Sequence, residues 1–238
     1  MKRYLVAASA LLLASVTAQA NPFSYSTSSG AIVNGVNVGG TADFDITGAH
    51  TFSITLSNTI PSITTAGQLL TDLQFNFGGM NVTMTGSLGQ QESIDQNGNV
   101  TLGADTSTGW GFGSLGGGTY LLCVICGHTG VTATVAPSEG VIGAGPFSSS
   151  QGSGSISGNG AHNPFLESGA TFYFETTSTL STTSTTSAFS NVNFSFGTTY
   201  GNDAPGTPKG SSNVPEPVTM ILTGGGLIAL SLVKRFRR

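Results

Sequence analysis

The sequence predicts an all-β protein, an antiparallel β-sandwich of jelly-roll type, flanked by an N-terminal signal helix and a C-terminal transmembrane helix. Three observations support this prediction. Several short segments alternate apolar and polar residues, as half-buried strands do. The composition, with 35 glycines in 238 residues and only 8% charged residues, suits strands and turns better than helices. Outside the two ends, no apolar stripe with helical spacing has a useful length.

Five segments carry the strand pattern most clearly. In each, one face carries large apolar side chains and the other carries Thr, Ser, Asn or Gln, so that one side covers a core and the other faces water. These segments are residues 51–56, 73–77, 80–84, 170–174 and 192–196. Weaker strand candidates are residues 31–38, 42–47 and 131–135. Gly78 and Gly79 lie between two strong candidates and predict a tight hairpin there.

Three polar segments predict loops. Residues 140–160 are rich in glycine and serine and predict a long loop. Residues 178–187 are almost all Ser and Thr, which is compatible with a polar edge strand or with a flexible loop. Residues 200–213, with Gly, Pro and Ser, predict a linker that holds the domain away from a membrane. The β-sandwich ectodomain is therefore expected to span residues 21–199.

The N-terminal segment, residues 1–20, has the order of a secretory signal peptide. Lys2 and Arg3 precede an apolar stretch over residues 4–16, and Ala18 and Ala20 place small residues where signal peptidase requires them. The apolar stretch is short for a membrane span. We expect cleavage after Ala20 and a mature chain that begins near Asn21; the alternative is a buried N-terminal helix of a cytosolic protein.

The C-terminal segment, residues 214–238, has three elements in a fixed order. Pro215, Glu216 and Pro217 are followed by an apolar, glycine-containing stretch over residues 218–233 and then by a basic terminus, Lys234 to Arg238. This order closely resembles the PEP-CTERM sorting signal. The resemblance implies that Pro215, Glu216 and Pro217 are the motif recognised by an exosortase, a membrane-embedded cysteine transpeptidase, and that the segment behind them is removed.

The physical properties of this segment agree with the resemblance. Sixteen helical residues rise about 24 Å, slightly less than a hydrocarbon core. The basic terminus would stay in the cytoplasm by the positive-inside rule, which leaves Glu216 on the outer side of the inner membrane. Its two proline neighbours would keep this motif extended. The alternative is an ordinary tail anchor that is not processed.

The charge of the exported part excludes one class of partner. Between the two ends Lys209 is the only lysine or arginine, whereas every Asp and Glu except Glu216 lies there. A surface with so few cations cannot neutralise phosphates, and nucleic-acid binding is therefore excluded.

The only two cysteines, Cys123 and Cys126, predict a local disulfide in an oxidising compartment. Gly127 separates Cys126 from His128 and excludes a c-type haem site. A thioredoxin-like role requires a helix that the sequence does not predict. A zinc site is the remaining alternative; besides His128 it would need His50, His162 or a carboxylate as fourth ligand.

Other candidate residues have simpler interpretations. His162, before Asn163 and Pro164, could be a ligand or a base, but the segment predicts a turn with Phe165 packed beneath it. Asp43 and Asp45 share one face of a strand and could hold calcium, although solvated aspartates on an edge strand are the simpler interpretation. The Cys-x-x-Cys pair, residues 162–165 and residues 193–197 are together similar to a group of uncharacterised PEP-CTERM proteins, which implies no activity.

Two functional hypotheses follow, with a hydrolase as a third. The first is a non-enzymatic protein with no cofactor, exported, processed by an exosortase and placed on the cell surface or in the exopolysaccharide matrix of a biofilm; the family resemblance implies the surface and matrix role in a Gram-negative bacterium. The second is a carbohydrate-binding module with an aromatic platform drawn from Trp110, Tyr120 and Tyr173. An exposed Trp110 beside a groove would favour the module, and a pocket with a histidine and carboxylates would favour an enzyme.

Overall fold

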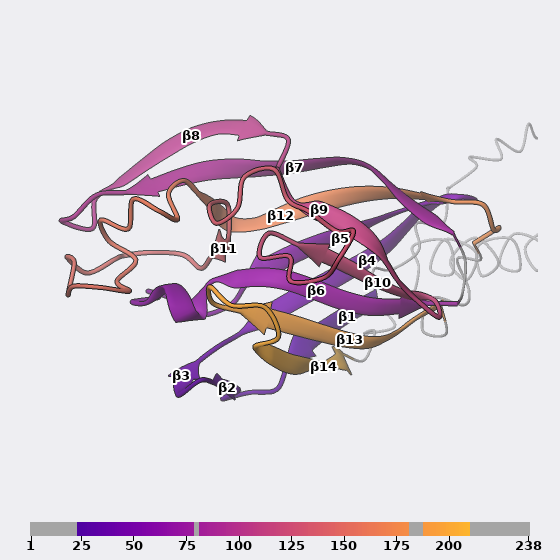
Figure 1. Ribbon diagram of the computed structural model, residues 1–238, viewed down its shortest axis with the longest axis horizontal. Coiled ribbons are helices and arrows are strands. Elements are labelled where there is room, and N and C mark those ends of the chain that lie inside the picture. The colour runs from indigo at the N-terminus through magenta and orange to yellow at the C-terminus, as the bar shows by residue number, and fades with distance from the viewer. Residues whose placement is uncertain (1–22, 79–80, 181–187, 210–238) are drawn as a thin grey trace, which may run out of the picture. The chain divides into compact units, whose positions relative to one another are not determined.

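The computed structural model describes residues 23–78, 81–180 and 188–209 (Figure 1). Strands are the dominant regular structure of this part of the chain, with irregular loops between them and a short 3-10 turn, η1 (Ala66–Gln68). The prediction of an all-β protein is confirmed.

The strands are numbered in chain order. They are β1 (Phe23–Thr27), β2 (Ile32–Val33), β3 (Val36–Asn37), β4 (Gly40–Gly48), β5 (Thr51–Asn58), β6 (Leu70–Phe77), β7 (Val82–Ile94), β8 (Val100–Thr106), β9 (Gly111–Gly116), β10 (Thr119–Cys123), β11 (Val141–Ile142), β12 (Phe165–Thr176), β13 (Phe189–Phe196) and β14 (Asp203–Lys209). Four of the five strongest strand predictions, residues 51–56, 73–77, 170–174 and 192–196, lie inside β5, β6, β12 and β13. The fifth, residues 80–84, lies partly in β7, which begins at Val82; Asn81 is irregular and Met80 is outside the described residues.

One large sheet holds all of these strands except β2 and β3, which form a small hairpin of their own. The order in the large sheet is β8, β7, β12, β5, β4, β1, β14, β13, β6, β10, β9. The short strand β11 pairs with β12 in parallel and with β6 in antiparallel orientation, while the other pairs are antiparallel. Because β12 and β6 are far apart along the sheet order, β11 closes part of the sheet into a ring (Figure 1).

Phenylalanine rings fill the space inside the curved sheet. Strand β4 alternates buried and half-buried residues, and its buried Phe44 contacts Phe189 of β13 with ring centroids 4.5 Å apart. Phe52 of β5 contacts Phe77 of β6 at 5.2 Å and Phe189 at 5.1 Å. Strands β4 and β5 form no hydrogen-bonded pair with β6 or β13, so these contacts join parts of the sheet that face one another. Such ring pairs contribute about 0.5–1.5 kcal/mol beyond the area that they bury.

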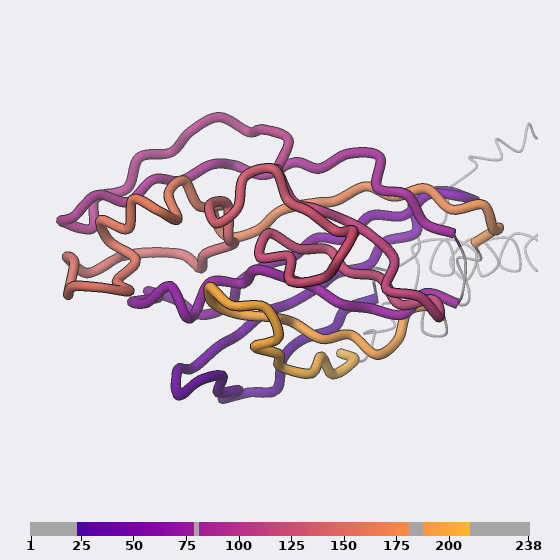
Figure 2. The backbone as a smooth tube through the Cα atoms, in the orientation of Figure 1, coloured from indigo at the N-terminus to yellow at the C-terminus, as the bar shows by residue number. Residues whose placement is uncertain are grey.

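A second apolar cluster anchors the loop predicted over residues 140–160. That segment is irregular apart from β11, and Phe147 and Ile156 from it pack with Ile63, Ile94 and Phe165. Figure 2 shows this loop at the left-hand end of the view, beside the turn that contains η1. The loop is therefore held by its own buried side chains.

The hairpin predicted at Gly78 and Gly79 is wrong. Strand β6 lies between β13 and β10, whereas β7 lies between β12 and β8, so the two strands that flank these glycines are not paired. Each strand finds its partners elsewhere in the sequence, and those partners leave β6 no free edge for β7. Gly79 lies outside the described residues, and the strands before and after it belong to different parts of the sheet.

Two further predictions are corrected. Residues 131–135 form no strand. This segment is irregular and lies beside the residues that precede β9, where the amide of Thr134 donates to the carbonyl of Gly109 at 2.8 Å. The linker predicted over residues 200–213 contains β14, which pairs with both β1 and β13. Pro205 and Pro208 suggested a linker, but residues from both neighbouring strands pair with β14, and Ala204 is buried in the core. The folded domain therefore extends at least to residue 209.

The predicted signal peptide, residues 1–20, and the predicted sorting segment, residues 214–238, lie outside the described residues, as do residues 181–187 of the Ser/Thr-rich segment. Within the described ranges, no helix combines the length and the apolar character needed to cross a membrane.

Candidate functional site

The residues predicted to direct export and sorting are not among those that the structure describes. They are Ala18, Ala20 and Asn21 at the signal cleavage site and Pro215, Glu216 and Pro217 in the sorting motif. Any functional site in the described structure must therefore belong to the β domain itself.

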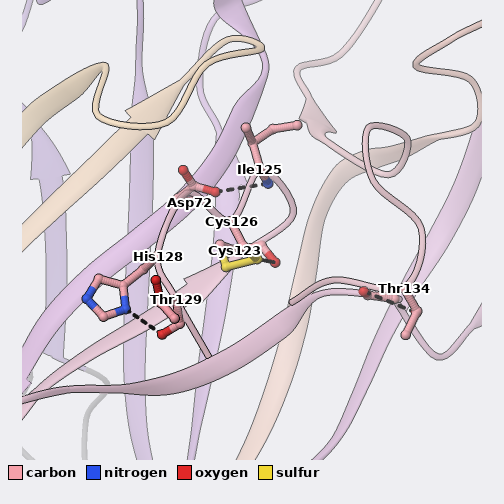
Figure 3. The surroundings of a disulfide bond; sticks show 8 residues. Asp72, Cys123, Ile125, Cys126, His128, Thr129 and Thr134 are labelled. Atoms are coloured by element: carbon pink, nitrogen blue, oxygen red, sulfur yellow. Dashed lines mark hydrogen bonds between the residues drawn. A yellow bond between two sulfur atoms is a disulfide. The ribbon is translucent and has the colours of Figure 1, made fainter. Parts of the chain in front are cut away.

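The predicted disulfide is present between Cys123, at the end of β10, and Cys126 (Figure 3). The loop that it closes is attached to β6, because the amide of Val124 donates to the carbonyl of Thr71 at 2.8 Å. His128 lies beside this loop, but its Nδ1 is 3.0 Å from the carbonyl oxygen of Thr129. Among the described residues no three His, Cys, Asp or Glu side chains come together in a way that could hold a metal ion, so the zinc alternative has no ligand set there.

Asp72 of β6 lies next to the disulfide loop and is completely buried. Its Oδ1 accepts a hydrogen bond from the amide of Ile125 at 3.2 Å, and its Oδ2 has no partner among the described residues. Burial raises the pKa of this carboxyl to about 8, and the charge of Asp203 raises it further, against the opposing effect of the Ile125 amide. At neutral pH Asp72 is therefore mostly uncharged, which is the form that a buried carboxyl without a cation prefers.

Tyr200 packs against the same loop. A Cβ atom built on Gly127 would lie 2.3 Å from the Tyr200 ring, so the ring rests against the bare backbone of this glycine. Tyr200 and Cys126 pack against a small apolar cluster formed by Leu121, Cys123 and Val131. The disulfide loop thus has the contacts of a structural element that fastens β10 to β6.

The predicted aromatic platform does not exist as such. Trp110 is 3% exposed and Tyr120 is 4% exposed, and both pack in the main core. Tyr173, on β12, is 43% exposed. Of the three candidate rings only that of Tyr173 is exposed, because the two others pack in the core, where large apolar groups are favoured.

Asp43 and Asp45 lie on one face of β4, as predicted, but not at an edge. Strand β4 is paired on both sides, with β5 and β1, and both side chains are half-buried. The Asp43 carboxylate accepts a hydrogen bond from the hydroxyl of Ser24 on β1. Within the described ranges no third acidic side chain joins this pair, so the calcium alternative has no ligand set there.

His162 lies in a turn that leads into β12, as predicted, and Phe165 is fully buried beneath it. Asn163 holds this turn against β7: its Oδ1 accepts from the amide of Ile94 at 3.0 Å. The His162 Nδ1 is 3.0 Å from the Asn159 Oδ1, and the His162 Nε2 is buried without a partner among the described residues. Burial lowers the pKa of the His162 imidazole.

A cleft of about 750 Å³ lies beside His162. Its walls come from residues 64–67 around the start of η1, from the loop between Gln151 and Ser155, from the turn with Asn159 and His162, and from Thr198. The Thr65 Oγ1 in this wall is also buried without a partner among the described residues. The sequence singled out only His162 of this site, because the other lining residues are ordinary polar ones in loops that only folding brings together.

Comparisons with known proteins identify no relative: no family model, no curated protein and no solved structure matches the chain.

Proposed function

We propose that this protein is exported, processed by an exosortase at Pro215 to Pro217 and delivered to the cell surface or the exopolysaccharide matrix, where its β domain has a non-enzymatic role. The observation that carries this proposal is the order of the last 25 residues, with a Pro-Glu-Pro motif, an apolar stretch and a basic terminus. The N-terminal order of basic, apolar and small residues supports export.

The β domain has properties that suit an exported protein. Its disulfide is compatible with an oxidising compartment. Hydroxyl and amide groups provide most of its solvation, since the chain has only 8% charged residues. We infer that the domain is a sandwich of jelly-roll type; the contacts of Phe44 and Phe52 with Phe189 across the interior support this finer description.

A hydrolase has less support than a binding role. The cleft that includes His162 has no carboxylate among its lining residues, and a histidine acting as a general base normally needs an acidic partner or a nucleophile in hydrogen-bond reach. A carbohydrate-binding module that uses an aromatic platform also loses support, because Trp110 and Tyr120 are buried. The polar cleft is the feature that favours a binding function of a different kind.

The proposed processing can be tested by mass spectrometry of the protein from cells with and without an exosortase. We expect a shortened C-terminus only where the exosortase is present, and an uncut chain in the Glu216→Gln variant. Glu175→Gln is the matched control, because it makes the same chemical change on β12 of the folded domain. An uncut C-terminus in both strains would contradict the proposal.

A further inference from the structure

We propose that the cleft between Thr65 and His162 binds a neutral saccharide through hydrogen bonds to its hydroxyl groups. This inference rests on the proposed function, since export to the matrix is what would bring polysaccharide to the domain. It identifies a binding site made from polar side chains in place of the aromatic platform that the sequence suggested.

The hydrogen bonds around Asn159 determine the state of the His162 ring. The Asn159 Nδ2 donates to the carbonyl of Ser155 at 3.0 Å, which turns the amide oxygen of Asn159 towards His162. An amide oxygen only accepts, so the proton of the neutral imidazole lies on Nδ1. The Nε2 atom of His162 is therefore an acceptor, and none of the described residues donates to it.

The second polar group without a partner is the Thr65 hydroxyl, which can donate a hydrogen bond where His162 Nε2 can only accept one. The Thr65 hydroxyl both donates and accepts. It occupies the N-cap position of η1, where it faces the backbone amide of Gln68, and its own proton has no acceptor in the described part of the chain. Leaving two polar groups buried and unpaired costs free energy, which a ligand that pairs with them would recover. Neither atom is exposed, and binding therefore requires a small rotation of the Thr65 or His162 side chain.

The charge of the cleft selects the ligand class. No Asp, Glu, Lys or Arg is among the residues that line it, and burial lowers the pKa of His162, which keeps the ring neutral. An anion would find no cation there, and a metal ion would find no carboxylate. A sugar hydroxyl donates to an acceptor such as His162 Nε2 and accepts from a donor such as Thr65, so a neutral saccharide satisfies both.

The walls of the cleft are held in place before any ligand binds. The amide of Ala66 donates to the carbonyl of Gly154 at 2.8 Å, and the amide of Ile156 donates to the carbonyl of Thr64 at 3.1 Å. Ile63 and Ile156 are each 1% exposed and fix these two segments to the apolar cluster below. A cleft of about 750 Å³ is within the usual range for small-molecule sites, and preformed walls reduce the entropy that binding costs.

The test is saturation-transfer NMR and calorimetry on the purified full chain with cellotriose, maltotriose and triacetylchitotriose as neutral probes and trigalacturonate as the acidic one. We expect at least one neutral probe to bind with a dissociation constant on the order of 1 mM, as suits a few hydrogen bonds without an aromatic platform. Binding should shift the ring nitrogen signals of His162.

Two variants and two matched controls make the test specific. Thr65→Val and His162→Phe should each weaken binding about 3-fold to 10-fold, the effect of one lost hydrogen bond. The midpoint of unfolding of each variant is measured as well, because Thr65 is also the N-cap residue of η1 and a loss of fold must be distinguished from a loss of binding. Thr106→Val on β8 and His128→Phe make the same changes outside the cleft and should leave binding unchanged.

Three outcomes would overturn the inference: no binding of any neutral probe, tighter binding of trigalacturonate than of every neutral probe, or equal weakening by the control variants. These outcomes are distinct from failure of the proposed function, which is read from the mass of the C-terminus. A chain that is cut by the exosortase but binds no sugar would refute the cleft proposal alone.

Discussion

The indole Nε1 of Trp110 donates a hydrogen bond of 2.8 Å to the backbone carbonyl of Glu139. The Glu139 carboxylate, in turn, accepts from the amide of Gly109 at 2.7 Å and from the side chain of Gln91 at 2.9 Å. Trp110 packs on Phe172 with ring centroids 5.2 Å apart. The only tryptophan is therefore part of a buried network that attaches an irregular segment to the sheet.

Removal of the Trp110 ring should destabilise the protein strongly. We expect Trp110→Ala to lower the free energy of unfolding by about 3–5 kcal/mol, because it leaves a cavity in the core. Trp110→Phe keeps an aromatic ring but leaves the Glu139 carbonyl unpaired, which costs about 1–3 kcal/mol. Urea unfolding measures both, and Tyr173→Ala, at an exposed ring, should change stability by less than about 0.5 kcal/mol. Equal effects of Trp110→Ala and Tyr173→Ala would contradict the burial of Trp110.

The buried Asp72 predicts stability that falls as the pH rises. Its pKa is about 8 in the folded protein and near 3.8 in the unfolded chain, so between these values the folded state holds a proton that the unfolded state has lost. Stability is thus fully present below about pH 4 and decreases towards pH 8, by at most about 1.4 kcal/mol per pH unit from this group. Glu92, whose pKa is raised to about 7 by burial and by the charge of Glu167, contributes in the same direction.

Asp72→Asn should remove much of this pH dependence. The amide has nearly the shape of the protonated carboxyl, so stability near pH 4 should change little, whereas stability at pH 8 should exceed that of the unaltered protein. Chemical unfolding at a series of pH values measures the effect. Asp105→Asn, which makes the same chemical change on the exposed strand β8, is the matched control. A parallel profile for Asp72→Asn and the unaltered protein would disprove the assignment.

The contact of Tyr200 with Gly127 predicts a coupled pair of substitutions. Gly127→Ala places a Cβ atom 2.3 Å from the Tyr200 ring and should cost about 1–3 kcal/mol of stability. In a background of Tyr200→Ala the same change should cost less, with a coupling energy of about 0.5–3 kcal/mol in a double-mutant cycle. Gly160→Ala, where a Cβ atom meets nothing within 4 Å, is the matched control. Additive effects in the cycle would show that the two residues do not contact one another.

The position of β14 predicts where the domain can be shortened. A chain that ends at residue 199 lacks the strand that joins β1 to β13, and we expect it not to fold. A chain that ends at residue 211 keeps β14 and should unfold cooperatively. Circular dichroism and the dispersion of amide proton signals distinguish the two. Cooperative unfolding of the shorter chain at the same temperature would mean that residues 200–213 are the linker that their composition suggests.

The local sequence pattern was sufficient to predict those features of the structure that depend only on a residue and its near neighbours in the chain. The alternation in residues 51–56 and 192–196 predicted β5 and β13, because a strand with one buried face requires that period. Only two residues lie between Cys123 and Cys126, so their pairing could be predicted locally, although the zinc alternative lost its ligand set only in the structure. The turn at Asn163 and Pro164 was likewise readable from its own residues.

The same reasoning failed where distant segments compete for a partner. Gly78 and Gly79 have the sequence of a hairpin turn, yet β6 pairs with β10 and β13, which lie far along the chain. Residues 203–209 contain two prolines and resemble a linker. They nevertheless pair with β1, which begins the described part of the chain, and with β13, which directly precedes them in the sequence. Strand pairing depends on which backbone segments come together in the fold, and the alternation of residues within one segment does not specify its partner strand.

The sequence by itself determined the all-β class and the closeness of the two cysteines, because alternation and short spacings act over a few residues. Only the tertiary structure decided the order of the strands, the burial of Trp110 and the meeting of Thr65 with His162 in one cleft. The physical reason is that hydrogen-bond partners, shared cores and unsatisfied polar groups are properties of segments brought together by folding. A residue far away in the chain determines whether an aromatic ring is covered or a hydroxyl is paired.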